Sequence, residues 1–188
     1  EMRPAKSTAP RTHYRELKKK QIWNAMLELL EEKPIKNITI REICDKALIH
    51  RTTFYNHFYD IFDLAVYGIR QIAINIGADN DSNDLHEQTD SILFFIKRYK
   101  RIFINMCDTE YSDEILKTVG NELNEELLRI IRISEKISKK KIAPEIMAKF
   151  FSAGLERMIS YWFESELPED ELRAEIFNVL DMIQNNIR

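Results

Sequence analysis

The segment 39–64 constrains the fold of this 188-residue chain more than any other part of the sequence. Thr39 and Glu42 have the spacing of a capping box, in which each residue satisfies a backbone N–H of the other, so a short helix is expected to begin at Ile40. A turn follows at 47–50, and a second helix of barely two turns is expected over 51–57. Helices this short are unstable alone in water, so neighbouring helices must hold both of them in place.

The second short helix has one apolar side and several polar groups on its other faces. Phe54 and Phe58, four residues apart, share the inner face. The remaining side chains of 51–57 supply a cation, two hydroxyls, a phenol, an amide and an imidazole. Such donors on a short, supported helix are typical of the recognition helix of a helix-turn-helix, which predicts double-stranded DNA as a partner.

The two motifs also indicate a family. TIREI at 39–43 and TFYNHF at 53–58, with a long amphipathic helix on each side, resemble the DNA-binding domain of TetR-family transcriptional regulators, over about 17–77. The resemblance implies an all-α chain with an N-terminal three-helix helix-turn-helix domain and a helical C-terminal domain for dimerisation and ligand binding. It also implies a homodimer that reads a palindromic operator, most often a repressor that leaves the operator when a ligand binds.

The expected organisation has four parts: a basic disordered tail at 1–14, the helix-turn-helix domain at 15–60, a connecting helix at 61–77 and the C-terminal domain at 78–188. Apolar periodicity predicts a first helix over about 16–33. In the C-terminal domain it predicts helices over 85–97, 101–107 and 113–133, one that starts near Pro144, and a last one marked by apolar residues from Ile176 to Ile187.

Charge is distributed unevenly along the chain, whose net charge is −3. Residues 1–60 hold 12 lysines and arginines against 8 acidic residues, whereas the remainder holds 16 against 23. A basic end attracts phosphate and an acidic remainder repels it, which suits a two-part DNA-binding protein. Basic tails are also common in proteins that bind no DNA, so the charge supports the motif and does not replace it.

The resemblance assigns roles to the predicted DNA-binding residues. Arg51 and Thr52 are expected to reach base edges, and an arginine there can bind guanine through two hydrogen bonds. Hydroxyl and imidazole donors on the same helix are expected to contact phosphate, as is Thr39 at a helix start. Asn56 could contact either. The phosphate-contacting set is Thr39, Thr53, Tyr55, His57, Lys18 and Lys19; the alternative for Tyr55 and His57 is that they only pack the short helix.

Three positions depart from the family pattern. Leu48 stands where the turn usually has glycine, so a residue with a Cβ must adopt whatever conformation the turn requires. His50 stands where a capping serine or threonine is usual. Ile61 stands where many members have a phosphate-binding lysine. These departures leave open a second class of function, a helical protein–protein interaction module whose reader domain no longer binds DNA.

The C-terminal domain carries two further predictions. An aromatic pocket for a small apolar or aromatic effector is expected, although aromatics at helical spacing also fit a plain core. Its candidates are Phe94, Phe95, Tyr99, Phe103, Phe151, Tyr161 and Trp162. A broad apolar face on the last two helices is hard to bury within one chain, which favours a two-fold dimer interface. Its candidates are Phe150, Gly154, Met158, Phe177, Leu180 and Ile183.

Other functions lack support in the sequence. Cys44 and Cys107 are far apart and are expected to be buried, reduced thiols. The acidic run 79–90 has the spacing of a calcium loop but lacks its glycine and its final glutamate, so a solvated linker is expected. The histidines show no metal spacing, and no nucleophile or phosphate-loop motif occurs. The expectation is a non-enzyme without a metal or cofactor. No apolar run is long enough to span a membrane, and a cytoplasmic location is expected.

Overall fold

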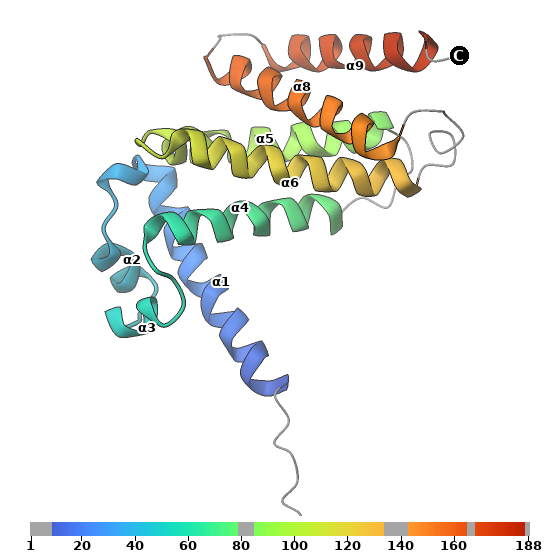
Figure 1. The fold of residues 1–188 in the computed structure, drawn as a ribbon. Helices are drawn as coiled ribbons and strands as arrows, with labels where there is room; N and C mark the ends of the chain where they lie inside the picture. Colours follow the sequence, from blue (N-terminus) through green and yellow to red (C-terminus); the bar gives the residue numbers. More distant parts are fainter. Residues whose placement is uncertain (1–8, 79–84, 134–142, 165–167, 187–188) are drawn as a thin grey trace, which may run out of the picture.

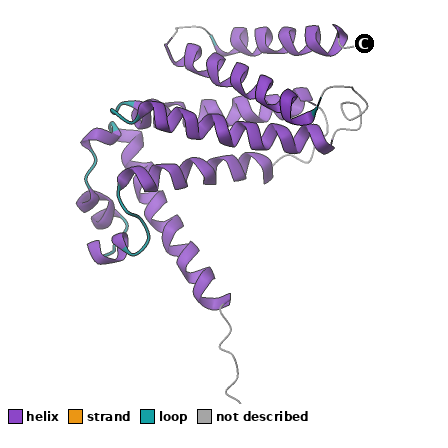
Figure 2. Cartoon of the chain, viewed as in Figure 1, coloured by secondary structure: helices purple, strands orange, loops and turns teal. Residues whose placement is uncertain are grey.

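The computed structural model describes residues 9–78, 85–133, 143–164 and 168–186, and over these ranges every regular element is helical (Figures 1 and 2). The all-α prediction is therefore confirmed. The elements are α1 (Ala9–Glu32), η1 (Ile35–Asn37), α2 (Ile40–Lys46), α3 (Arg51–Tyr55), α4 (Ile61–Ala78), α5 (Leu85–Cys107), α6 (Ser112–Ile133), α8 (Pro144–Glu164) and α9 (Glu169–Asn186).

Most expected boundaries are close to the observed ones, and two are wrong. Helix α1 begins at Ala9, so 9–14 is helical and not part of a disordered tail. Helix α5 runs unbroken from Leu85 to Cys107, where two helices were expected, because the polar stretch 97–101 fits the helix: Lys97, Arg98 and Arg101 are exposed while Tyr99 packs against the core. The linker and the first half of the calcium-loop pattern, 79–84, lie outside the described residues, whereas its second half, 85–90, is helical in α5.

The chain folds into a small head (residues 9–60) and a larger body (residues 85–186), joined by α4 (Figure 1). In the body α6 packs against α4, α5 and, most extensively, α8, while α9 contacts α5. One continuous hydrophobic core runs from the head into the body, from Ile22 in α1 to Ile176 in α9. The head is therefore fixed to the body by packing and not only by chain connection.

A close contact between α1 and α4 sets the position of α1 in the head. Trp23 of α1 is only 4% exposed, and its indole lies against the backbone of α4 at Gly68. A Cβ built on Gly68 would lie 2.2 Å from the Trp23 ring, which no real packing allows. Only glycine lets the indole approach the α4 backbone this closely.

The C-terminal end of α5 makes polar and aromatic contacts with the head. Asn105 Nδ2 donates to the Leu30 carbonyl at the end of α1, at 2.7 Å. Asp108, just after α5, pairs with Lys36 of η1 at 2.6 Å. Tyr111 stacks on Phe62 in the first turn of α4, with ring centroids 5.4 Å apart. These three residues, Asn105, Asp108 and Tyr111, form a joint that contacts α1, η1 and α4.

Candidate nucleic-acid interface

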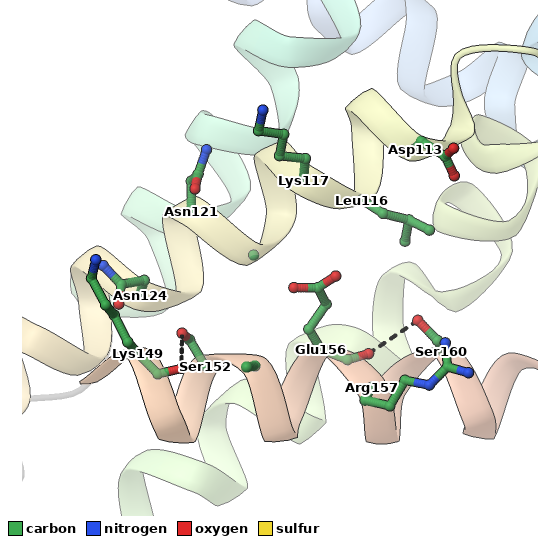
Figure 3. A pocket seen from close by; sticks show the side chains of 12 residues that line it. Asp113, Leu116, Lys117, Asn121, Asn124, Lys149, Ser152, Glu156, Arg157 and Ser160 are labelled. Carbon is green, nitrogen blue, oxygen red and sulfur yellow. Dashed lines mark hydrogen bonds between the residues drawn. The ribbon is translucent and has the colours of Figure 1, made fainter. Parts of the chain in front are cut away.

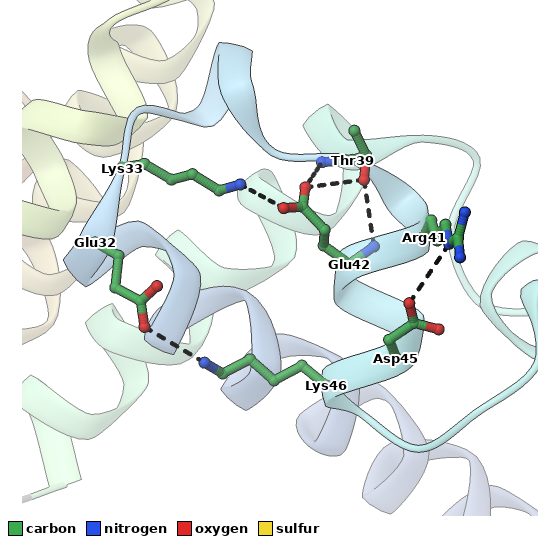
Figure 4. Close-up of polar contacts among 7 residues, drawn as sticks. All are labelled: Glu32, Lys33, Thr39, Arg41, Glu42, Asp45 and Lys46. Carbon is green, nitrogen blue, oxygen red and sulfur yellow. Dashed lines mark hydrogen bonds and ion pairs between the residues drawn. The ribbon is translucent and has the colours of Figure 1, made fainter.

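The first helix of the helix-turn-helix begins with the predicted capping box (Figure 4). Thr39 Oγ1 accepts from the Glu42 backbone N–H at 3.3 Å, and a Glu42 carboxylate oxygen accepts from the Thr39 backbone N–H at 2.9 Å. Lys33 Nζ donates to the other carboxylate oxygen at 2.5 Å. This Lys33 bond, followed by the two Thr39 bonds, lowers the pKa of Glu42 to about 2.

The same network bears on the predicted phosphate contact of Thr39. Its hydroxyl also donates to the Glu42 carboxylate, at 2.9 Å, so both Thr39 donors are directed at Glu42. A phosphate at Thr39 would have to displace the carboxylate. The phosphate contact of Thr39 therefore stays a prediction, and the Glu42 carboxylate would compete with the phosphate for the Thr39 donors.

The turn between the two short helices contains two of the three departures from the family pattern. Leu48 has a φ of 52°, the left-handed conformation that glycine usually supplies, and its side chain is 88% exposed. His50 is the N-cap of α3 and makes no side-chain capping bond. The recognition helix thus starts without the side-chain cap that serine or threonine would give.

Helix α3 presents the donor face that the sequence predicts. Phe54 is fully buried, and Phe58 just after the helix is 2% exposed. Five predicted DNA contacts stand on the outer side or beside it: Arg51, Thr52, Tyr55 and Asn56 are exposed, and Thr53 is half-buried. Tyr55 keeps 56% of its surface exposed while its ring packs edge-on against Phe54. The helix ends at Tyr55, with Asn56 as its C-cap, so it is shorter than the expected 51–57.

His57 lies at the contact between the recognition helix and α1. Its ring is half-buried, and Nδ1 is buried without a hydrogen-bond partner in the described part of the chain. Desolvation lowers the pKa of His57, and the nearby cations Arg15 and Lys19 lower it further. The lowered pKa favours the neutral imidazole, and an incoming phosphate would be attracted to the two cations beside it.

The predicted contacts Lys18 and Lys19 are both engaged in the described structure. Lys18 Nζ donates to Gln21 at 2.9 Å, and Gln21 Nε2 donates to the Ala47 carbonyl at 2.7 Å, which ties α1 to the turn of the motif. Lys19 pairs with Glu16 at 3.4 Å and lies over the Tyr67 ring. Both lysines therefore hold the head together, and their charges still lie near His57.

Ion pairs neutralise most other cations of the head (Figure 4). Lys46 pairs with Glu28 at 3.2 Å and Glu32 at 3.6 Å, and Arg41 pairs with Asp45 at 3.6 Å. Within the described ranges three exposed cations of the head keep no ion pair: Arg15, Lys20 and Arg51. Arg15 and Lys20 were not among the predicted site residues, because a sequence cannot show which cations in a basic run become paired.

Helix α4 starts with acidic capping in place of a phosphate-binding lysine. Asp60 Oδ1 accepts from the Asp63 backbone N–H at 2.8 Å, and Asp63 Oδ2 accepts from the Tyr59 backbone N–H at 3.0 Å. Ile61 is partly buried against the core. The Tyr59 side chain, also not predicted, is 85% exposed beside the recognition helix. Its phenol can donate to phosphate.

The five predicted pocket residues whose side chains are described differ in burial. Phe94 and Tyr161 are exposed at 59% and 57%, Phe103 is in the core, and Tyr99 and Phe151 are partly buried against that core. The side chains of Phe95 and Trp162 lie outside the described residues. These positions fit the plain-core alternative for three residues, and the aromatic effector pocket stays a prediction.

The predicted dimer face is partly exposed on α8. Phe150 is 67% exposed, and Ile146 and Tyr161 on the same side of the helix are 60% and 57% exposed. A Cβ on Gly154 would meet nothing within 4 Å. Met158 and Phe177 are partly buried, and the side chains of Leu180 and Ile183 lie outside the described residues. An apolar stripe of Ile146, Phe150, Gly154 and Tyr161 thus lies open on one protomer.

Two further properties concern the described residues only. They contain no group of three or more histidine, cysteine, aspartate or glutamate side chains placed to hold a metal ion. None of their helices combines the length and apolar character needed to cross a membrane. Cys44 is buried and Cys107 is partly buried, and both are free thiols; burial raises the pKa of Cys107 to about 11.

None of the family models matches the sequence, and none of the curated proteins does. Solved structures do match. A protein of Syntrophomonas wolfei described as a TetR-family transcriptional regulator is 18% identical, with a TM-score of 0.69 over 90% of this chain and 95% of that one.

Two other structures are similar over nearly their whole length. The dihydroxyacetone kinase operon activator DhaS is 16% identical, with a TM-score of 0.72 over 91% of this chain and 98% of that one. The TetR-family repressor AlkX of a Dietzia strain, implicated in the biodegradation of n-alkanes, is 13% identical, with a TM-score of 0.63 over 90% and 96%. The chain therefore has the fold of TetR-family transcriptional regulators.

Proposed function

We propose that this protein is a homodimeric, sequence-specific DNA-binding regulator of transcription. One observation carries the proposal: on a head with the TetR-family fold, α3 exposes its donors, and His57 just after α3 lies near Arg15 of α1, a cation that has no ion pair among the described residues. Donors on a recognition helix can read base edges, and unpaired cations beside it can bind the flanking phosphates. Arg51 and Thr52 are assigned to bases, and Thr53, Tyr55 and Arg15 to phosphates.

The open apolar stripe of α8 supports the dimeric part of the proposal. A stripe that includes Phe150 and Tyr161 is costly to leave in water, and a second copy of the same stripe would cover it by two-fold symmetry. Two recognition helices would then enter successive major grooves about 34 to 36 Å apart, or a multiple of this distance, on a palindromic operator.

The proposed regulatory sign is repression, with release of the operator when a ligand binds the body. The neighbours do not favour one sign, because one is described as an activator and another as a repressor. A reporter fused to the bound promoter would test the sign. Higher reporter output after deletion of the protein is expected, and lower output would make it an activator.

The direct test is binding of the purified protein to its own upstream intergenic DNA, beside a random duplex of equal length, at two salt concentrations. We expect selective binding that weakens steeply with salt, because phosphate contacts release counterions. Weak, equal binding to both duplexes would instead favour the interaction module. The specific observations behind that alternative are Ile61 packed in place of a lysine and Glu42 occupying the donors of Thr39.

Three substitutions separate base contacts from phosphate contacts. Thr53→Ala and Tyr55→Phe should weaken binding to specific and random DNA alike, by about 1 kcal/mol each for a lost hydrogen bond. Arg51→Ala should mainly reduce the preference for the specific site, by about 1–3 kcal/mol. Arg101→Ala, which removes an exposed cation of α5 in the body, is the control and should change neither. Equal losses on both duplexes for Arg51→Ala would refute its assignment to bases.

A further inference from the structure

A polar groove of about 600 Å³ runs between α6 and α8, away from the DNA-binding head (Figure 3). Each helix contributes six residues with the same helical spacing, so one full side of each helix lines the groove. The α6 side is Asp113, Leu116, Lys117, Gly120, Asn121 and Asn124. The α8 side is Lys149, Ser152, Ala153, Glu156, Arg157 and Ser160. The volume lies in the range of small-molecule sites.

Glu156 is the central polar group of the groove. Its side chain points from α8 towards α6, where Gly120 leaves room for it (Figure 3). A Cβ on Gly120 would lie 2.4 Å from Glu156 Oε2, so any other residue would push the carboxylate away. No hydrogen-bond donor or cation in the described part of the chain pairs with this carboxylate, although three cations line the same groove.

Further acceptors lie along the groove. Asn124 Oδ1 is buried and has no hydrogen-bond partner among the described residues. The hydroxyls of Ser152 and Ser160 donate to the backbone carbonyls of Lys149 and Glu156, which leaves their oxygens as acceptors. Buried acceptors without a donor are unfavourable, so the groove is suited to a ligand that supplies donors.

Three cations border these acceptors. Lys117, Lys149 and Arg157 are exposed, and none pairs with a carboxylate within the described ranges. Most of the acidic body would repel an anion, whereas these three would attract one. They would also repel a cationic ligand from Glu156. The donors that reach Glu156 and Asn124 should therefore be neutral hydroxyl groups.

We propose that this groove binds a small anion that carries hydroxyl groups, either a hydroxycarboxylate or a polyol phosphate. Lys149, which lies beside Asn124, binds the acid group, Lys117 and Arg157 attract the anion from other parts of the rim, and Glu156 and Asn124 accept from the hydroxyls. This ligand is chemically unlike the apolar or aromatic effector that the sequence predicts. On α8 the groove borders the apolar stripe, because helical spacing places Arg157 between Ile146 and Phe150, so a partner protomer on the stripe would lie beside the groove.

Helix α6, which lines the groove, also contacts α4, the helix that joins head and body. On the opposite side of α6, Glu122 pairs with Arg70 of α4 at 3.2 Å. A ligand that moves α6 would change this contact and hence the orientation of α4. The claim that the ligand regulates DNA binding rests on the proposed function. The claim that the groove binds the ligand does not.

The binding test is calorimetry on the full-length protein with glycerol 3-phosphate and malate, beside glycerol and inorganic phosphate. We expect glycerol 3-phosphate or malate to bind at least about tenfold more tightly than glycerol or inorganic phosphate. Only the hydroxylated anions can use both the cations and the acceptors of the groove. The preferred probe identifies the acid group as phosphate or carboxylate. No binding of either hydroxylated anion, or equal binding of inorganic phosphate alone, would overturn the proposal.

Variants then locate the site. Lys149→Gln and Glu156→Gln should each weaken binding of the preferred probe by about tenfold. Arg101→Gln, which removes a cation from α5 outside the groove, should leave it unchanged. Gly120→Ala should abolish binding without lowering the melting temperature, because alanine favours the helix while its Cβ displaces Glu156. Unchanged binding in Gly120→Ala or Glu156→Gln would show that the anion binds elsewhere.

The regulatory part has its own outcome. Addition of the bound probe should change the affinity of the wild-type protein for its operator, and Glu156→Gln should remove that change. A protein that binds its operator but no probe refutes the groove and leaves the proposed function intact. A protein that binds the probe but no DNA refutes the proposed function and leaves the binding site intact.

Discussion

Leu48 holds a conformation that most side chains avoid. Its φ of 52° lies in the left-handed region, which costs a residue with a Cβ about 1–2 kcal/mol. The side chain is 88% exposed and so gains little burial in return. The turn that orients α3 is therefore formed against a local preference, and packing of Phe54 and Phe58 must offset the cost.

Leu48→Gly should stabilise the protein. Glycine adopts the left-handed region freely, and its entropy cost in the unfolded chain offsets part of the gain, so we expect an increase of about 0.5–1 kcal/mol in the free energy of unfolding. Denaturant unfolding followed by circular dichroism would measure it. Leu48→Ala is the control, because alanine keeps the Cβ and should bring no comparable gain. A loss of stability in Leu48→Gly would mean that the leucine side chain contributes contacts.

The charge of Glu42 should make part of the stability depend on pH. Its pKa is lowered from 4.5 to about 2, so its contribution is fully present above pH 4.5 and is lost as the pH falls towards 2. Glutamine can keep the capping bond without the charge. The difference in melting temperature between wild type and Glu42→Gln should therefore be largest above pH 4.5 and should shrink towards pH 2. A difference that does not vary with pH would contradict the Lys33–Glu42 interaction as its source.

At the scale of elements, two contacts decide how α1 meets the rest of the protein. Trp23 lies on the α4 backbone at Gly68, and Asn105 of α5 donates to the Leu30 carbonyl at the end of α1. These contacts join residues that are far apart in sequence. They fix the direction in which α1 leaves the body and carries its cations past the recognition helix (Figure 1).

Gly68→Ala should destabilise the protein by about 1–3 kcal/mol, because the added methyl group would overlap the Trp23 ring. This outcome is the reverse of helix propensity, which favours alanine. Denaturant unfolding of Gly68→Ala, Trp23→Leu and the double variant would test it. The double variant should lose less stability than the two single losses added together, since the smaller leucine makes room. Simple additivity would show that the two residues do not compete for the same space.

At the scale of the whole molecule, the open stripe of α8 is the surface through which we expect two protomers to associate. Phe150→Glu places a charge in the centre of the stripe. It should convert a dimer into a monomer and weaken binding to a full operator, because two linked half-site contacts become independent. Analytical ultracentrifugation and operator titration would measure both effects. Ile74→Glu is a matched control, because Ile74 is a similarly exposed apolar residue, at 60%, on α4.

The control variant should remain dimeric and bind DNA as the wild type does. A wild-type protein that sediments as a monomer would refute the dimer. A dimeric Phe150→Glu variant would place the interface elsewhere on the body.

The sequence by itself determined the local features of this protein. The Thr39–Glu42 capping box, the start of α2 at Ile40, the buried pair Phe54 and Phe58 and the amphipathic helices are set by hydrogen bonds and periodicity within a few residues. The exposed donor face of α3 follows from the same periodicity. Leu48 was singled out only through the resemblance, because the family's turn usually has glycine at this position, and its left-handed backbone is seen in the structure.

Only the tertiary structure decided which groups meet across the chain. Periodicity does not indicate that Trp23 contacts Gly68, that Lys18 and Lys19 are engaged while Arg15 and Lys20 keep no ion pair in the described ranges, or that Glu156 faces Gly120 in a polar groove. Each contact depends on the distance between two helices, and that distance is set by the packing of the whole core. Local hydrogen bonds form the helices, whereas core packing determines which side chains come together as sites.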